Sequence, residues 1–177
     1  MEIREATIDD ALVIANIHAE SWSRSYARVL TRQYLEHQVP NEREKIWKDR
    51  FSKPRPDQYV IAALIDGEII GFACSYIDGI NELGAFLDNL HVALPHQGAG
   101  IGRALLQAIA LKCVESDPNR GLCLTVNQDN VPAQEFYLRL GATNIGEDLW
   151  SAPDGSIVPT YWFAWNNAVS LTRNEQG

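Results

Sequence analysis

Apolar residues in the first third of the chain recur mainly at helical spacing. Residues 3–6 alternate as a short strand, and residues 7–10 then supply N-cap oxygens for a helix with apolar positions from 12 to 22. Pro40 interrupts a second helical stretch. Residues 41–44, an asparagine followed three residues later by a glutamate, predict that a third helix starts there with a capping box.

The pattern then changes to period two. Residues 59–65 and 68–77 flank an Asp66–Gly67 turn and form the clearest hairpin in the sequence. The rest of the chain predicts a strand over 86–94, a glycine-rich loop over 95–100, a helix over 101–113, a strand over 122–126, a helix from Pro132 to Gly141, and a closing antiparallel pair over 144–150 and 157–165.

This order of elements predicts one α/β domain with a largely antiparallel sheet. No repeat, low-complexity tract or linker divides the chain. We therefore expect residues 1–166 to form a single domain and residues 167–177 to form a polar, frayed tail.

Composition narrows the class of protein. The chain has 177 residues, 46% of them hydrophobic, and a net charge of −8, which argues against general nucleic-acid binding and weakly suits a cationic partner. No apolar run reaches the roughly 20 residues of a membrane helix, and residues 1–5 do not resemble a signal peptide, so we expect a cytoplasmic protein without a membrane partner. The three cysteines lie in apolar segments at no metal-ligand spacing, which predicts buried thiols and no metal site.

The most informative segment is a glycine-rich loop between a predicted strand and a predicted helix. Gly98, Gly100 and Gly102 alternate there, so the main chain can approach a ligand closely and point successive N–H groups at one anion. A Walker A loop is excluded, because Arg103 and Ala104 follow the last glycine in place of lysine and serine or threonine. A dinucleotide fingerprint is disfavoured, because the glycine spacing differs and the next strand ends without a carboxylate.

This segment resembles the coenzyme A loop of the GNAT superfamily of N-acetyltransferases. The resemblance implies a mixed, mostly antiparallel twisted sheet flanked by helices, with a V-shaped opening between the central strands. It also implies acetyl-CoA as co-substrate and no metal. In such a site the backbone of Leu90 and Val92 holds the pantetheine arm, and the loop holds the pyrophosphate. The residues expected to bind the cofactor here are Leu90, His91, Val92, Gln97, Gly98, Ala99, Gly100, Ile101, Gly102 and Arg103.

A second segment, residues 130–141, also resembles the family pattern, which continues with phenylalanine where this chain has Ala142. The resemblance implies that Asn130 and Ala133 contact the coenzyme and that Tyr137 protonates the departing thiolate. A phenol with a pKa near 10 suits a leaving thiolate of similar basicity. On periodicity alone, Tyr137 would be a core aromatic residue.

Acceptor activation is less clear from the sequence. The two positions where family members usually carry a catalytic glutamate are Phe86 and Thr125. Asp88 is the best remaining candidate for a proton relay or for holding the cationic amine, since alternation places it on the same strand face as Leu90 and Val92. The alternatives are a structural role for Asp88, a base among Glu82, His91 and His96, or no side-chain base at all.

The acceptor is predicted only as a class. In this fold the first helices and the closing strands line the acceptor cleft, which favours Trp22, Tyr26 and Tyr161 as substrate contacts, with Tyr34 and Trp150 as further aromatic candidates. The expected acceptor is the amine of a small molecule or a peptide. A catalytically silent acyl-CoA-binding module is the competing function, and a homodimer is possible because two-fold oligomers are frequent among similar proteins.

Overall fold

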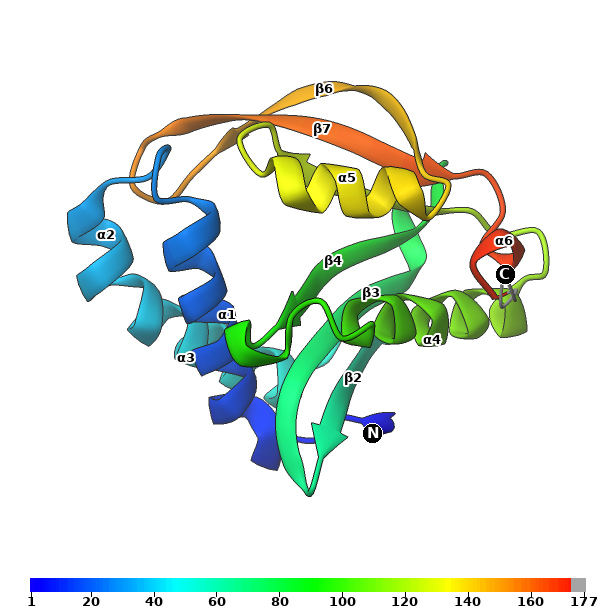
Figure 1. The fold of residues 1–177 in the computed structure, drawn as a ribbon, viewed down its shortest axis with the longest axis horizontal. Coiled ribbons are helices and arrows are strands. Elements are labelled where there is room, and N and C mark those ends of the chain that lie inside the picture. Colours follow the sequence, from blue (N-terminus) through cyan, green and yellow to red (C-terminus); the bar gives the residue numbers. More distant parts are fainter. Residues whose placement is uncertain (173–177) are drawn as a thin grey trace.

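The structure is a computed structural model that describes residues 1–172. Seven strands form one sheet, and the longer helices cover its two faces (Figure 1). The elements are β1 (Glu2–Glu5), η1 (Ile8–Asp10), α1 (Ala11–Ser25), α2 (Arg32–His37), α3 (Val39–Ser52), β2 (Gln58–Ile65), β3 (Glu68–Asn81), β4 (Gly84–Val92), η2 (Leu94–His96), α4 (Ile101–Ser116), β5 (Leu122–Asn127), α5 (Val131–Arg139), β6 (Thr143–Ser151), β7 (Ile157–Trp165) and α6 (Val169–Thr172).

The sheet opens in its middle. Its strand order is β1-β2-β3-β4-β5-β7-β6, and every neighbouring pair is antiparallel except β4 and β5. Those two parallel strands pair only at Ala85 with Leu122 and at Phe86 with Cys123. Beyond these residues β4 and β5 diverge, as Figure 1 shows. The predicted V-shaped opening and the mixed, mostly antiparallel sheet are therefore confirmed.

Alternation along β2 and β3 supplies apolar side chains to both faces of the sheet. On one face α4 packs through Leu105, Leu106 and Ile109 against a cluster that includes Ala73. On the opposite face α1 and α3 pack against Phe72. The two halves of the sheet thus each have helical cover, and α5 lies against β7 on the far side of the opening (Figure 1).

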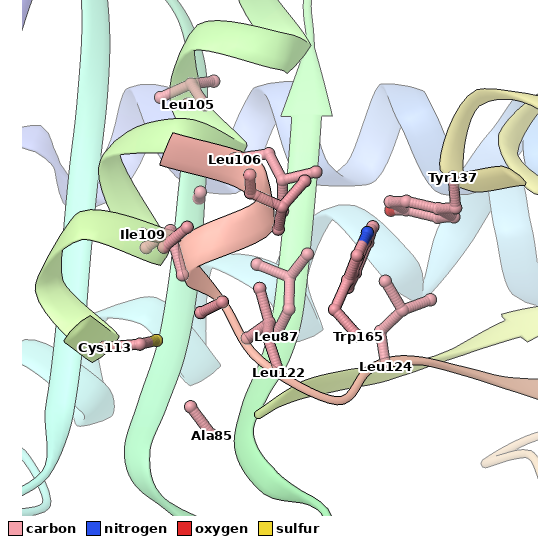
Figure 2. Packing of buried hydrophobic residues seen from close by; sticks show 14 of the residues in the cluster. Ala85, Leu87, Leu105, Leu106, Ile109, Cys113, Leu122, Leu124, Tyr137 and Trp165 are labelled. Carbon is pink, nitrogen blue, oxygen red and sulfur yellow. The ribbon is translucent and has the colours of Figure 1, made fainter. Parts of the chain in front are cut away.

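The larger core joins the two arms of the opening. Figure 2 shows Leu87 of β4, Leu124 of β5 and Trp165 of β7 facing the apolar side of α4. The indole Nε1 of Trp165 donates to the Leu140 carbonyl at 2.8 Å, which ties β7 to the end of α5. This packing fixes the position of α5 and of the tyrosine that it carries into the cluster.

Three sequence predictions need correction. Helix α3 begins at Val39, so Pro40 lies inside its first turn and does not interrupt it. A proline is tolerated there because the N–H groups of the first turn make no hydrogen bond within the helix. The predicted capping box at 41–44 does not form, because the N-cap of α3 is Gln38 and residue 41 already lies inside the helix, where Glu44 pairs with Lys48. Strand β3 continues to Asn81, beyond the expected end at residue 77.

The expected polar tail is partly ordered. Residues Val169–Thr172 form the short helix α6, and Ala168 and Leu171 are buried in the core beside α4. Residues 173–177, the remainder of that predicted tail, lie outside the described residues. Within residues 1–172, no helix is both long and apolar enough to cross a membrane.

Candidate active site

The opening between β4 and β5 continues into a cleft of about 1180 Å³. Its walls come from α1, α3, β4, the loop before α4, β5, α5 and the β6–β7 pair. The Asn127 amide donates to the Ser25 carbonyl at 3.2 Å, so the end of β5 is tied to the end of α1. A cleft of this size has room for a coenzyme-sized ligand and a second, smaller molecule.

The edge of β4 that faces the opening carries backbone groups that β3 does not pair, although the Val92 carbonyl accepts from the Gln97 side chain. The Ala93 N–H donates to the Ile70 carbonyl of β3 at 2.8 Å. Because backbone groups alternate sides along an antiparallel strand, the N–H and C=O groups of Leu90 and Val92 point away from β3 and toward the opening. The side chains of Leu90 and Val92 pack on the α4 core, and their backbone faces the cleft. An extended ligand with amide groups could hydrogen-bond to this edge as an added strand does.

The glycine-rich loop forms a positive-φ turn into α4. Gly98 has φ +80° and Gly100 has φ +81°, a region where other residues are strained. Gly100 is the N-cap of α4, and the Ala104 N–H is the first to bond back into the helix, to the Gly100 carbonyl. The N–H groups of residues 101–103 therefore remain available at the positive end of the helix dipole. This is the geometry of an anion site.

The neighbouring loop residues have distinct positions. The Gln97 side-chain amide donates to the Val92 carbonyl at 2.9 Å, so it ties the loop to the end of β4. Ile101 is buried, and Arg103 lines the cleft at half-burial. Ala99 does not line the cleft, so of the ten residues predicted for the strand and loop it is the one that the cleft does not include.

Tyr137 reaches the cleft from α5. Its side chain is 8% exposed, and its ring lies edge-on to Trp165 with 6.1 Å between the ring centroids (Figure 2). Burial raises the pKa of Tyr137 above the ordinary value for a phenol. The phenol is therefore fully protonated near neutral pH, which is the form that a proton donor requires.

Asn130 and Ala133 lie at the start of the same helix. The Asn130 Oδ1 accepts from the Ala133 N–H at 3.3 Å and caps α5. Both residues line the cleft. The cap accounts for Asn130 as a structural residue, and its contact with a coenzyme stays a prediction.

Asp88 does not share the face of Leu90 and Val92, contrary to the sequence prediction. The β3–β4 register shifts between the pairs Ser75–Leu87 and Cys74–Asn89, which leaves Asp88 as the extra residue of a β-bulge. The bulge turns Asp88 and Asn89 toward the same partner, Arg50 of α3. Period-two alternation fails at this point because a bulge adds one residue to one strand only.

Arg50 holds the bulge from the helix side. Its Nη1 donates to the Asn89 Oδ1 at 2.9 Å and lies 2.7 Å from the Asp88 Oδ2. The second contact is an ion pair at hydrogen-bond distance, so the Asp88 carboxylate is paired with Arg50 through its Oδ2. Asp88 thus lines the cleft as a carboxylate held in place by Arg50.

His91 lies on the other face of β4 from Val92, as alternation predicts. Its Nδ1 is 2.8 Å from the Ser21 Oγ, and its ring stacks on His18 with 4.7 Å between centroids. Burial and the nearby charges of Arg24 and Arg43 lower the pKa of His91 to about 4. His91 is therefore neutral near pH 7, and it lines the cleft on the side of α1.

The other candidate bases differ in position. Glu82 is exposed in the β3–β4 turn and does not line the cleft. His96 in η2, Phe86 of β4 and Thr125 of β5 do line it. The two positions of the usual family glutamates thus face the cleft but carry no titratable group.

Two of the three aromatic residues predicted as substrate contacts line one end of the cleft. Trp22 lies 4.8 Å from Tyr26 and 5.5 Å from Trp150, measured between ring centroids, and all three line the cleft. Tyr161 does not line it, because this side chain packs on the core beside Phe163. Tyr34 is buried and bonds to Glu42 outside the cleft.

Sequence reasoning missed two arginines of α3. Arg43 and Arg50 both line the cleft, and Arg43 is only 6% exposed. They lie four residues before and three residues after the buried Trp47, hence on one helix face. That spacing was the available signal, but arginines are ordinarily assigned to the solvent face.

The cysteines are free thiols outside the cleft. Cys74, Cys113 and Cys123 are all buried, and burial raises the pKa of Cys74 to about 12. A thiol with so high a pKa is a poor nucleophile near neutral pH. The sequence-based prediction of buried thiols is confirmed.

Fold and cleft together describe a transferase site built on an open sheet. The family model for the "Acetyltransferase (GNAT) family" matches residues 16–142, and the chain belongs to that family. The resemblance inferred from the two sequence segments is therefore confirmed.

Two relatives and one solved structure illustrate the match. The chain is 28% identical over 152 residues to "Uncharacterized N-acetyltransferase YuaI" of Bacillus subtilis (strain 168), covering 82% of each chain. It is 36% identical over 84 residues to "5-NmdU N-acetyltransferase" of Pseudomonas phage PaMx11, a match that spans 48% of this chain and only 56% of that protein. The structure of yncA, a putative acetyltransferase from Salmonella typhimurium with its cofactor acetyl-CoA, shares the fold with a TM-score of 0.66, at 16% identity, over 93% of this chain and 92% of that one.

Proposed function

We propose that this protein transfers an acetyl group from acetyl-CoA to a primary amine by direct attack in a ternary complex. The observation that carries the proposal is the meeting of three features in one cleft: the free backbone edge of β4, the anion-binding start of α4, and the buried hydroxyl-bearing side chain of Tyr137. Each feature suits one part of an acyl-coenzyme, namely the pantetheine amides, the pyrophosphate and the thioester sulfur. The related structure that contains acetyl-CoA supports the choice of co-substrate.

The proposed coenzyme contacts follow the geometry. The backbone of Leu90 and Val92 pairs with the pantetheine arm. The N–H groups of residues 101–103 hold the pyrophosphate, with Arg103 as the nearby cation. Gln97 contributes by fixing the loop to Val92. No metal takes part in this proposal.

The chemistry is one displacement at the thioester carbonyl. The amine nitrogen forms a bond to the carbonyl carbon while the carbon–sulfur bond breaks, and the Val92 N–H donates to the oxygen that gains negative charge. Tyr137 gives its proton to the departing thiolate. The proton that the amine loses goes to water or to Asp88, which lines the cleft beside Arg50.

Two assays test the proposal together. Acetyl-CoA should raise the melting temperature of the protein, whereas NAD and ATP should not. Thiol release should then appear with at least one amine from a panel of amino acids, polyamines, aminoglycosides and short peptides, with 5-NmdU added because it gives the phage relative its name. Tight acetyl-CoA binding with no thiol release across the panel would favour the silent acyl-CoA-binding module instead.

The remaining sequence predictions are also proposals. We infer a cytoplasmic location, a single catalytic domain that extends beyond the expected end at residue 166 to include α6, and a small-molecule or peptide acceptor, with a homodimer as the oligomer to look for. Cell fractionation tests the location, limited proteolysis tests the single domain, and light scattering tests the homodimer.

A further inference from the structure

The cleft has a charge opposite to that of the protein. The chain as a whole carries 23 acidic and 15 basic residues, yet six arginines and three aspartates line the cleft, with no lysine or glutamate among its described lining residues. Arg103 and Arg139 lie in the half formed by the glycine loop and α5, where coenzyme phosphates are proposed to bind. The other four arginines lie on α1, α3 and the chain just after α1, at the end where the acceptor would enter.

Arg43 differs from the rest of this group. Its guanidinium is stacked 4.1 Å above the centroid of the Trp22 ring and is almost entirely buried. Its Nε has no hydrogen-bond partner within the described part of the chain. Its nearest carboxylate, Glu42, lies 3.6 Å from Nη2, beyond hydrogen-bond distance, and already accepts from the Tyr34 hydroxyl. Arg43 is thus a buried cation with unused donors.

Arg50 provides the contrast. Its charge is matched by Asp88 and its Nη1 donates to Asn89. A buried guanidinium is normally satisfied in this way, because desolvation makes an unpaired charge unfavourable. The unused donors of Arg43, in the wall of a ligand cleft, therefore indicate that a ligand anion completes its set of partners.

Arg43 is also well placed relative to the reacting groups. It stacks on Trp22, Trp22 contacts Tyr26 at 4.8 Å, and both aromatic residues line the cleft together with Asp88. Arg43 and Asp88 both lie close enough to Tyr26 to shift its pKa, in opposite directions, and all three residues line the cleft. The two charges can bind the two ends of one small zwitterion.

We propose that the acceptor amine also carries a carboxylate, and that Arg43 binds this carboxylate while the amine lies toward Asp88 and the thioester. This inference rests on the proposed acetyl transfer. The planar guanidinium matches a carboxylate with paired N–H donors, and its stacking on Trp22 fixes the orientation. The acceptor class is then a free amino acid or a similar small amino-carboxylate, and cationic polyamines are disfavoured by the surrounding arginines.

The test compares matched acceptors in the full-length protein. Free α-, β- and γ-amino acids are assayed beside their carboxamides and beside spermidine, with thiol release as the readout. The best amino acid should have a kcat/KM at least about 10-fold above that of its amide, as expected for a charge-assisted contact. Arg43→Gln should raise the KM for that amino acid about 10- to 100-fold and remove the preference over the amide. Arg32→Gln, at an exposed arginine of α2 outside the cleft, is the matched control and should change neither value.

The outcomes separate this inference from the proposed function. Equal or better turnover of amides or spermidine would overturn the carboxylate proposal and leave acetyl transfer intact. If no amine is acetylated, the proposed function fails, and the carboxylate inference is then tested by the melting temperature of the protein with coenzyme A bound. A further rise in melting temperature on adding amino acids, lost in Arg43→Gln, supports carboxylate binding. No such rise overturns it. If Arg43→Gln does not fold, Arg43→Lys, which keeps the charge without the planar fork, and the wild-type preference over the amide serve as the test.

Discussion

Arg50 of α3 and Asp88 of β4 form an ion pair across the cleft wall, with 2.7 Å between Nη1 and Oδ2. The pair joins a helix from one layer to the β-bulge of the central strand, and Asn89 accepts a hydrogen bond from the same nitrogen. The bulge therefore exposes one carboxylate to the cleft in a fixed position. Under the proposed chemistry, Asp88 assists the amine and Arg50 positions Asp88.

Asp88→Asn should lower kcat/KM for the amine acceptor about 10- to 100-fold, because the amide keeps the shape of the side chain but cannot take a proton or balance an ammonium group. Acetyl-CoA affinity should be unchanged. The pH profile of the reaction checks the role: the loss should shrink at high pH, where the free amine is already neutral. Asp49→Asn, at an exposed carboxylate on α3 next to Arg50, is the control. A loss that stays constant across pH would contradict a part in deprotonation.

Gly100→Ala should weaken acetyl-CoA binding. Gly100 has φ +81° at the N-cap of α4, and an alanine there is strained by about 1–2 kcal/mol, which shifts the backbone that presents the free N–H groups. We expect the Kd for acetyl-CoA, measured by calorimetry, to rise about 10-fold. Gly67→Ala is a matched control, since Gly67 has φ +82° in the β2–β3 turn and lies outside the cleft. It should lower stability by a similar amount without changing the Kd.

Stability should fall on mild acidification because of the stacked histidines. Burial lowers the pKa of His91 to about 4, and burial together with His91, Arg43 and Arg50 lowers that of His18. The unfolded chain takes up these protons near pH 6.5, so it binds more protons than the folded chain between about pH 6.5 and 4. The free energy of unfolding should therefore decrease as pH falls through this window, by at most about 1.4 kcal/mol per pH unit for each histidine.

Two glutamine variants test the origin of this dependence of the unfolding free energy on pH, measured by denaturant unfolding from pH 7 to 4. His91→Gln should flatten the slope, because one buried imidazole no longer titrates. His37→Gln, at the exposed last turn of α2, should leave the slope as it is. A wild-type slope that His91→Gln does not change would show that other groups govern the acid sensitivity.

Local sequence signals predicted most of the fold. The hairpin around Asp66 and Gly67, the glycine-rich loop and the helix that follows Pro132 all formed where the pattern placed them. These features depend on short-range rules of turn and cap geometry. The start of α3 was wrong by two residues, because Pro40 is equally compatible with a break and with a first helical turn.

Sequence reasoning was less successful for the parts of the candidate site that depend on strand register and on the packing of helices. Strict alternation placed Asp88 beside Leu90, and only the register of β3 against β4 reveals the bulge that reverses it. Alternation alone also could not say that Thr160 and Trp162, and not Tyr161, face the cleft. Arginine side chains are usually exposed, so the sequence favoured a solvent-facing Arg43, whereas the packing of α3 buries it.

The central claim is that Tyr137 donates a proton to the coenzyme thiolate, and the turnover of Tyr137→Phe tests it most directly. At saturating acetyl-CoA and acceptor, we predict that kcat from thiol release falls about 100-fold or more, while the Kd for acetyl-CoA changes little. Tyr161→Phe, a tyrosine of the same core that does not line the cleft, should keep the wild-type kcat. Unchanged turnover in Tyr137→Phe would contradict the account, and the proton would then have to come from another group or from water.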